Sequence, residues 1–439
     1  MAFSSLPPSG NAVPAGFLLR AGGGDFTAEF AAHGGHKEDR ILFTDSATSA
    51  LYIACRGLAD LRGSQASGPS LRVAVPAWCC PSVPQAVLQA GLVPVPVDLD
   101  PATLAYHPAA LEAARAHPQG LAAIILVHFF AMPAPCPEGD WSGTLLLRDC
   151  AQDFDYRPAP GDPAPCIYSF GRGKALNAGH GGALCIPLGV PAHHGNDALL
   201  ARCRKAWEEL PASHARIWPK ALAINLLSEP HWFRAVSAVP GLGIGATVWD
   251  APLAFARMAA GFPRLGSACL EAWLQRRDYY RQLMTRYRRL IWACDREAFL
   301  SPMAPPLPPP STASIPARFP IRIPDAALRA GFFSATRLRF GGVTRMYPSA
   351  LPDLPGAPPF LDGAGDYPGA RVVAESLLTL PITAHLMGTE DRFFEGLADI
   401  LMGLGVLRQA PAPRAAPDWS PAPAMVSDAA FLPHSMPYL

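Results

Sequence analysis

Residues 122–128 read AAIILVH and residues 144–149 read TLLLRD, two apolar runs that each end on a polar side chain. Four further runs of this kind are RVAVP at 72–76, VPVPVD at 93–98, CIYSF at 166–170 and GALCI at 182–186. Continuous rather than alternating apolar residues are typical of strands that are buried on both faces of a sheet. Helical stretches at 82–90 and 108–116 lie between some of these runs. Strand and helix in turn predict an α/β fold with a mostly parallel sheet.

The composition limits the classes of protein that this chain can represent. With 439 residues, half of them hydrophobic, it is long enough for a large core and two domains. A formal net charge of +1 gives no electrostatic reason to expect nucleic acid or an anionic membrane as a partner. The ten cysteines include no CxxC pair and no zinc-like Cys/His spacing, so we expect reduced thiols and no metal site.

The chain shows no pattern of a secreted or membrane protein. The first residues lack the basic and apolar regions of a signal peptide. The most apolar run, at 121–131, is shorter than the roughly 20 residues that cross a bilayer. We therefore expect a cytoplasmic protein.

Shifts in composition divide the chain into segments. We predict a loose arm at 1–24, a large domain at 25–265, a smaller α+β domain at 266–408, and a Pro/Ala-rich tail at 409–439. Within the large domain, the segment 187–250 is rich in Trp and Pro. For that segment we predict no element beyond a helix near 197–209.

The stretch 267–294 predicts a long amphipathic helix. Its apolar side is predicted to consist of Leu270, Trp273, Leu274, Leu283, Tyr287 and Ile291. Arginines occupy the other sides, and we interpret them as a solvated face rather than a nucleic-acid patch.

Polar residues stand at the carboxyl ends of the predicted strands, where open parallel sheets bind their ligands. These residues are His128, Asp149 and Ser169. A carboxylate at the end of a buried strand requires a cationic partner, and a protonated pyridine nitrogen is one such partner. The alternative for Asp149 is an N-cap of the following turn. We interpret His128 as a hydrogen-bonded strand-end histidine, because no companion metal ligands are spaced around it.

Lys174 lies in the glycine-rich stretch SFGRGKALNAGHGG at 169–182. Glycines allow the sharp turns that would bring this lysine back to the sheet edge. There it could capture an aldehyde as an imine, if burial or a nearby cation lowers its pKa. The alternatives are an ordinary surface lysine or a phosphate loop, although neither Walker A nor GxGxxG is matched.

Ser46, Ala47, Thr48 and Ser49 open a predicted helix. Free backbone N–H groups and the helix dipole make such a start an anion site, although simple capping is an equal alternative. In chain order, these features are a possible phosphate site at the helix start Ser46–Thr48, the strand-end residues Asp149 and Ser169, and the glycine-flanked Lys174. This order is the one that a pyridoxal phosphate (PLP) site on this sheet requires.

Over roughly residues 40–405, the sequence resembles the DegT/DnrJ/StrS sugar aminotransferases, which are fold-type I PLP enzymes. The segments that carry the resemblance are SATSALYIA (46–54), VPAWCCPSVPQAVLQAGLVPVPVDLDPATL (75–104), ILVHFFAMPA (125–134), LRDCAQ (147–152), SFGRGKALNAGHGGAL (169–184) and ESLLTLPI (375–382). The resemblance implies a large domain with a mostly parallel mixed sheet flanked by helices, and a smaller C-terminal domain.

The resemblance also implies residue roles. Lys174 would be the Schiff-base lysine and the acid/base of transamination, Asp149 would hold the pyridine nitrogen, and Gln152 the ring hydroxyl. The implied phosphate-binding residues are Ala47, Thr48 and Ser169. Some family members carry histidine in place of the lysine and dehydrate sugars, so a lysine here favours amino transfer. By analogy the site would lie at the interface of a homodimer.

Four departures from the family pattern surround the substrate side. Cys80 stands where the family stacks an aromatic on the cofactor ring, so either Trp78 takes over or the stacking is lost. His180 replaces the acidic residue of the family's GEGG. The N-Y-R segment, which reaches in from the partner subunit, reads ATVWD at 246–250. The region before it is enlarged.

The favoured hypothesis is a PLP-dependent aminotransferase that moves an amino group from an amino acid, by family analogy glutamate, to a nucleotide-linked keto-sugar. A second hypothesis keeps the cofactor but changes the acceptor or the reaction, for example to dehydration. A third is a catalytically idle relative that serves as a scaffold or regulator. The vicinal Cys79–Cys80 pair suggests redox control only weakly, because cysteine is also a small buried residue.

Overall fold

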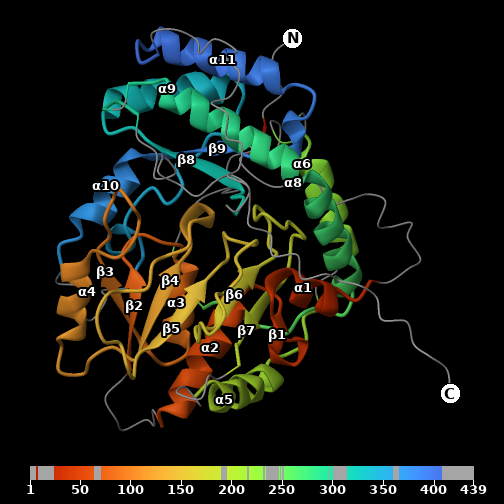
Figure 1. Ribbon diagram of the computed structural model, residues 1–439, viewed down its shortest axis with the longest axis vertical. Coiled ribbons are helices and arrows are strands. Elements are labelled where there is room, and N and C mark those ends of the chain that lie inside the picture. The colour runs from red at the N-terminus through yellow and green to blue at the C-terminus, as the bar shows by residue number, and fades with distance from the viewer. Residues whose placement is uncertain are drawn as a thin grey trace, which may run out of the picture.

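The computed structural model describes residues 6–7, 24–63, 71–188, 195–214, 217–230, 233, 247, 249, 252–295, 297–299, 314–358 and 365–407. In Figure 1 these residues form a large sheet flanked by helices, with a smaller group of elements above it. Most of the predicted arm at 1–24, and the predicted tail at 409–439, lie outside the described residues.

The large sheet has the strand order β1-β7-β6-β5-β4-β2-β3. Its strands are β1 Ile41–Thr44, β2 Arg72–Pro76, β3 Val93–Val97, β4 Ala123–Val127, β5 Leu145–Asp149, β6 Cys166–Ser169 and β7 Gly182–Cys185. Strands β2 to β6 pair in parallel, whereas β7 is antiparallel to both of its neighbours, β6 and β1. The predicted α/β fold with a mostly parallel mixed sheet is confirmed.

Each of the six predicted apolar runs contains one strand, and β1 is the strand that the sequence did not predict. It is only four residues long and pairs along its whole length with β7. Strands β6 and β7 are equally short and were predicted, so the length of β1 does not explain why it was missed.

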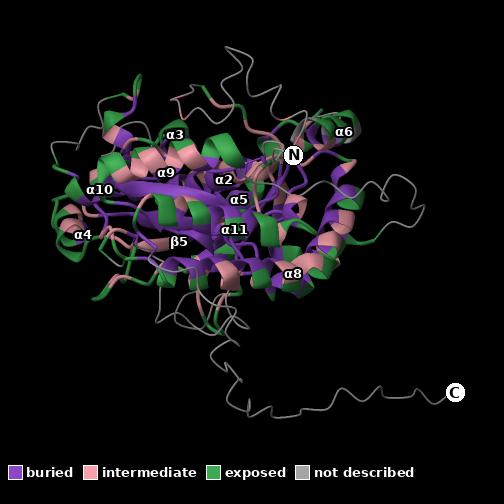
Figure 2. Cartoon of the chain, turned by 90° about the horizontal axis from the view of Figure 1, so that it is seen from above, coloured by how far each residue is buried: buried purple, intermediate pink, exposed green. Residues whose placement is uncertain are grey.

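Helices cover both faces of the large sheet, which explains why its strands are continuously apolar. On one face lie α2 (Ala47–Leu61), α3 (Ser82–Gln89) and α5 (Gly195–Glu209), and on the other α1 (Phe26–Gly34), α4 (Pro108–Arg115) and α8 (Phe262–Trp292). Along β2, Val73 and Val75 belong to the core under α2 and α3, whereas Ala74 faces α4. Figure 2 shows buried strands between partly exposed helices.

Before residue 265, two further helices were not predicted, α1 and α6. Asp25 caps α1, because its carboxylate accepts hydrogen bonds from the backbone N–H groups of Thr27 and Ala28. In the segment 187–250, the predicted helix is α5, and α6 (Ile217–Ser228) follows it. The apolar residues of α6 do not gather into one stripe, so sequence periodicity could not identify it.

Helix α8 begins five residues before the predicted start. Of the six residues on its predicted apolar side, five are buried, but Leu274 is 45% exposed and that assignment was wrong. A hydrophobic core runs from α1 along α8 to the C-terminal elements. The proposed domain boundary between 265 and 266 falls inside this helix, and the division into domains stays a proposal.

The C-terminal elements include an antiparallel pair, β8 (Arg318–Arg322) and β9 (Leu377–Pro381). The helices of this C-terminal part of the chain are α9 (Ala326–Arg339), α10 (Pro368–Ser376) and α11 (Glu390–Gly403). Asp98, directly after β3, is buried and accepts hydrogen bonds from the N–H groups of Gly369 (3.0 Å) and Ala370 (2.8 Å) at the start of α10. Within the described residues, no helix is both long and apolar enough to cross a membrane.

Candidate active site

A cavity of about 220 Å³ lies at the carboxyl ends of β4, β5 and β6. It is lined by Ser46, Ala47, Thr48, Leu51, Cys79, Cys80, Ser82, Val83, Val127, Asp149, Ala151, Gln152, Ile167, Ser169, Lys174 and Tyr347. From the resemblance, eight residues were considered for a role at the cofactor. Seven of them line this cavity, and Trp78 is the exception. The structure thus brings together residues from four separate segments that parallel strands deliver to one edge.

The mouth of α2 forms one wall of the cavity. Ser46 is the N-cap, and its hydroxyl oxygen accepts a hydrogen bond from the backbone N–H of Ser49 at 3.1 Å. Asp45 in turn accepts hydrogen bonds from the hydroxyls of Ser46 (3.2 Å) and Ser49 (2.5 Å). The backbone N–H groups of Ala47 and Thr48 stand in the first turn of α2, where they have no partner within the helix and where helices bind anions.

Asp149 is the last residue of β5 and is 8% exposed. Its Oδ1 accepts a hydrogen bond from the backbone N–H of Ala151 at 3.0 Å. Burial raises the pKa of its carboxyl group above the ordinary value, while the Ala151 N–H, Lys174 and His128 oppose that rise. A bound cation would relieve the cost of keeping this carboxylate charged.

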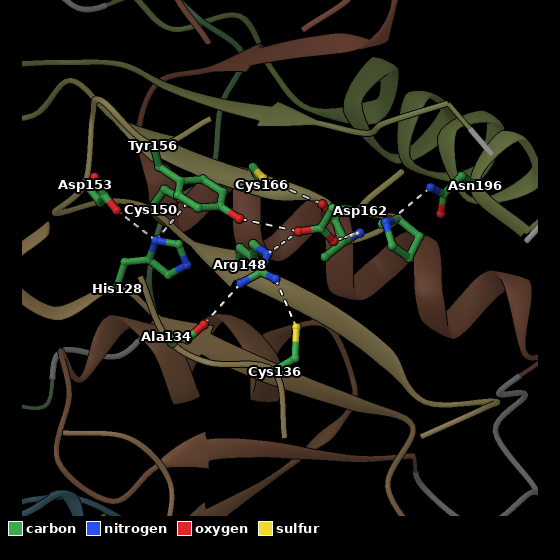
Figure 3. A network of polar contacts seen from close by, with 12 residues as sticks. His128, Ala134, Cys136, Arg148, Cys150, Asp153, Tyr156, Asp162, Cys166 and Asn196 are labelled. Carbon is green, nitrogen blue, oxygen red and sulfur yellow. Dashed lines mark hydrogen bonds and ion pairs between the residues drawn. The ribbon is translucent and has the colours of Figure 1, made fainter. Parts of the chain in front are cut away.

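Figure 3 shows a network of polar contacts that includes the chain neighbours of Asp149, Arg148 and Cys150, and the strand-end His128. His128 Nδ1 is 2.9 Å from Asp153 Oδ2, and both side chains are fully buried. Cys150 Sγ lies 3.8 Å from the same nitrogen, and the ring of Tyr156 meets the imidazole edge-on at a centroid distance of 4.5 Å. His128 is therefore a hydrogen-bonded strand-end histidine, as the sequence indicated.

Gln152 connects the cavity to a strained turn. Its Oε1 accepts a hydrogen bond from the backbone N–H of Phe130 at 3.3 Å. Phe130 and Ala131 both have left-handed backbones, with φ of 52° and 58°. Such strain in non-glycine residues is uncommon and clusters at functional sites.

Lys174 follows the glycine turn that leaves β6. Its backbone N–H donates to the carbonyl of Gly171 at 3.3 Å, and Gly173 has a φ of 80°, which glycine adopts readily. Burial lowers the pKa of the Lys174 ammonium, Cys80 and Asp149 oppose that change, and Arg318 adds to it. An amine with a lowered pKa is a better nucleophile toward an aldehyde.

The structure places Trp78 behind the cavity wall. Its side chain is fully buried, and its indole Nε1 donates a hydrogen bond to the backbone carbonyl of Tyr347 at 2.8 Å. The geometry therefore does not favour Trp78 as the replacement for the aromatic expected at Cys80. Of the segment 246–250, only Thr247 and Trp249 are described, so its proposed role lies largely outside the described residues.

Sequence reasoning missed several residues of the cavity. Cys79 was noted only as a possible redox partner, and Ser82 only as the start of a helix. Tyr347 was not singled out at all, because it lies 173 residues after Lys174 and reaches the cavity only through the tertiary fold. No local pattern in the sequence around it marks it as a cavity residue.

Residues 22–188 match the sequence profile of the DegT/DnrJ/EryC1/StrS aminotransferase family. The chain is 30% identical over 223 residues to 3-amino-5-hydroxybenzoate synthase of Amycolatopsis mediterranei (strain S699), covering 47% of this chain and 55% of that one. It is 32% identical over 169 residues to L-glutamine:2-deoxy-scyllo-inosose aminotransferase of Micromonospora echinospora, covering 36% and 37%. The chain thus spans about half, or less, of the length of these relatives.

The fold agrees over a longer stretch. The crystal structure of DesI in the presence of its TDP-sugar product superimposes with a TM-score of 0.62, at 21% sequence identity, over 91% of this chain and 93% of that one. This chain therefore has the fold-type I architecture.

Proposed function

We propose that this chain, whose residues 22–188 match the profile of the DegT/DnrJ/EryC1/StrS aminotransferase family, is a PLP-dependent aminotransferase of that family. One observation carries the proposal. A single cavity contains the mouth of α2, the buried carboxylate of Asp149, and the amine of Lys174, which burial makes less basic. These are an anion site, a site for a ring cation, and a nucleophile toward an aldehyde.

The residues present fit the cofactor. PLP supplies an electron sink for the carbon that gains or loses the amine. The N–H groups of Ala47 and Thr48 and the Ser169 hydroxyl would hold its phosphate, and Asp149 would pair with its ring nitrogen. By the resemblance, Gln152 would contact the ring hydroxyl. The Phe130 N–H orients the Gln152 amide, because it donates to Oε1.

Lys174 would have two duties. Its Nζ would hold the cofactor before substrate binds, and the freed amine would then carry a proton between the two carbons that exchange it. A pKa lowered by burial suits both duties, since the neutral amine is the form that attacks and the form that accepts a proton. The aliphatic side chains of Val83, Val127 and Ile167 form part of the same cavity wall.

For the substrates, we propose that an amino acid is the amino donor, and by family analogy this amino acid is glutamate. We propose that the acceptor is a cyclic polyhydroxy ketone. The names of the similar proteins support this class, because they include an inosose aminotransferase and a protein with a TDP-sugar product. A nucleotide-linked keto-sugar is the acceptor that the resemblance favours. A homodimer with sites at its interface remains part of this proposal.

The test is spectroscopic and uses the full chain. PLP added to the purified protein should give the visible absorbance band of a lysine-linked cofactor. An amino donor should remove the band, and the correct cyclic ketone should restore it. Lys174→Ala should give no such band, whereas Lys205→Ala, which changes an exposed lysine of α5, should behave as the unaltered protein.

The outcomes separate the three hypotheses. An unaltered protein that forms no band would contradict PLP dependence and favour an idle relative. A band that forms but responds to no amino donor would favour a different PLP reaction. Full activity in Lys174→Ala would remove Lys174 from the mechanism.

A further inference from the structure

Tyr347 is the only aromatic side chain among the described residues that line the Lys174 cavity. It comes from the C-terminal part of the chain, between α9 and α10, and not from the segments that supply the other lining residues. The side chains beside it on the wall include the thiols of Cys79 and Cys80, both from the loop after β2. The cavity therefore receives its one aromatic ring from a distant segment.

The backbone of Tyr347 is strained. Its φ is 47°, in the left-handed region that bulky residues rarely adopt and that costs on the order of 1 kcal/mol. Strain of this kind persists only where the surrounding structure holds the residue in place, and it clusters at ligand sites.

The loop after β2 holds Tyr347 at two points. The Trp78 indole donates to the Tyr347 carbonyl at 2.8 Å, and the two rings meet edge-on with centroids 5.1 Å apart. Four residues later, the backbone N–H of Leu351 donates to the carbonyl of Ala77 at 2.7 Å. Trp78 itself is fully buried and packs against Phe129, at a ring distance of 5.2 Å.

The phenol of Tyr347 remains neutral under ordinary conditions. Burial raises its pKa well above the usual value, and Cys80, Cys79 and Asp149 add to the rise while Arg318 opposes it. Tyr347 therefore lines the cavity as a neutral phenol.

We propose that Tyr347 is the aromatic residue that packs against the ring of the bound cofactor, and that Trp78 is a positioning residue that holds it there. This inference rests on the proposed function. Two aromatic rings in contact attract one another beyond their simple burial of area. The other described walls of the cavity are aliphatic, thiol or polar, so no other described side chain there can make a ring contact.

The test compares Tyr347→Asn with Tyr347→Phe in the full-length protein. Asparagine tolerates the left-handed backbone, so the variant loses the ring without adding backbone strain, and the cost of the lost packing against Trp78 is measured separately as the melting temperature of the PLP-free protein. The dissociation constant of PLP, from titration of the visible band, should rise about 3- to 10-fold in Tyr347→Asn. Tyr347→Phe keeps the ring and should bind PLP as the unaltered protein does.

Two results would overturn the inference. One is a Tyr347→Asn protein with an unchanged dissociation constant and an unchanged band. The other is a loss in Tyr347→Phe as large as in Tyr347→Asn, since the hydroxyl and not the ring would then carry the contact. Failure of the unaltered protein to form the band would instead contradict the proposed function. Comparing the unaltered protein, Tyr347→Asn and Tyr347→Phe therefore distinguishes a failure of this inference from a failure of the proposed function.

Discussion

At the scale of single residues, the buried carboxyl group of Asp149 lowers the stability of the folded protein when no cofactor is bound. Its carboxyl is buried at a strand end and its pKa is raised. The folded protein therefore binds this proton more tightly than the unfolded chain, in which aspartates titrate near pH 3.9. Ionised Asp149 lowers the stability of the PLP-free protein at pH values above that point, and the loss is complete once the pH exceeds the raised folded pKa.

We expect Asp149→Asn to stabilise the PLP-free protein at pH 8 and to have little effect near pH 3, where the Asp149 carboxyl is mostly protonated in both the folded and the unfolded protein. The asparagine oxygen can still accept the Ala151 N–H, so the turn is kept. PLP binding should weaken in the same variant, because the charge opposite the ring nitrogen is gone. Urea unfolding at both pH values and a PLP titration measure these opposite effects.

Asp140 offers a control with the reverse sign. It is exposed, and hydrogen bonds from Ser142 lower its pKa. Asp140→Asn should therefore lose rather than gain stability at neutral pH and should not alter PLP binding. If Asp149→Asn were the less stable protein at pH 8 as well, the burial cost assigned to Asp149 would be wrong.

At the scale of elements, the site depends on how closely β7 approaches the start of α2. A Cβ atom on Gly182 would overlap the backbone of Ser46 and Ala47, which cannot move without displacing the mouth of the helix. Only glycine allows this approach, and the N–H groups proposed to bind phosphate are fixed by it.

Gly182→Ala should destabilise the protein by about 1 to 3 kcal/mol, the usual cost of overpacking a rigid contact. It should also weaken PLP binding, because the helix mouth must shift. Chemical unfolding and PLP titration report the two effects. Gly195→Ala in α5 is the matched control, since its added methyl group meets no atom within 4 Å and should cost nothing. Equal stability of the two variants would contradict the close contact.

At the scale of the whole molecule, the cavity is completed by the C-terminal part of the chain. Tyr347 comes from that part, and the same part is fastened to the large sheet by Asp98, which caps the start of α10. Tyr287 of α8 adds a second tie, because its hydroxyl donates to the Pro381 carbonyl at 2.8 Å. The geometry of the site therefore depends on how the C-terminal elements dock.

Asp98→Ala should lower the free energy of unfolding by about 1.5 to 3 kcal/mol, the range for hydrogen bonds to a charged group. Asp353→Ala is the comparison, because it removes an exposed ion pair with Arg371 of the same helix and should cost under about 1 kcal/mol. Denaturant unfolding of both variants measures the difference. If both substitutions lower the free energy of unfolding equally, the hydrogen bonds of Asp98 do not hold the C-terminal part of the chain to the large sheet.

Patterns within the sequence were enough for six of the seven strands of the large sheet and for several residues of the cavity. Buried parallel strands are locally apolar, and their carboxyl ends meet at one edge whatever the rest of the chain does. The strand-end residues Asp149 and Ser169, the helix start at Ala47–Thr48, and Lys174 in its glycine turn could therefore be chosen from local signals, and the structure brings them together.

What only the tertiary structure determined are the contacts between segments far apart in the chain. Trp78 lies behind the cavity wall, Tyr347 lines the cavity, and Asp98 caps a helix that begins 270 residues later. None of these follows from periodicity or spacing, because a contact over such a separation depends on how whole elements pack. Lys174 could thus be predicted from the order of several local signals along the chain, whereas the ring proposed to face its cofactor required the fold.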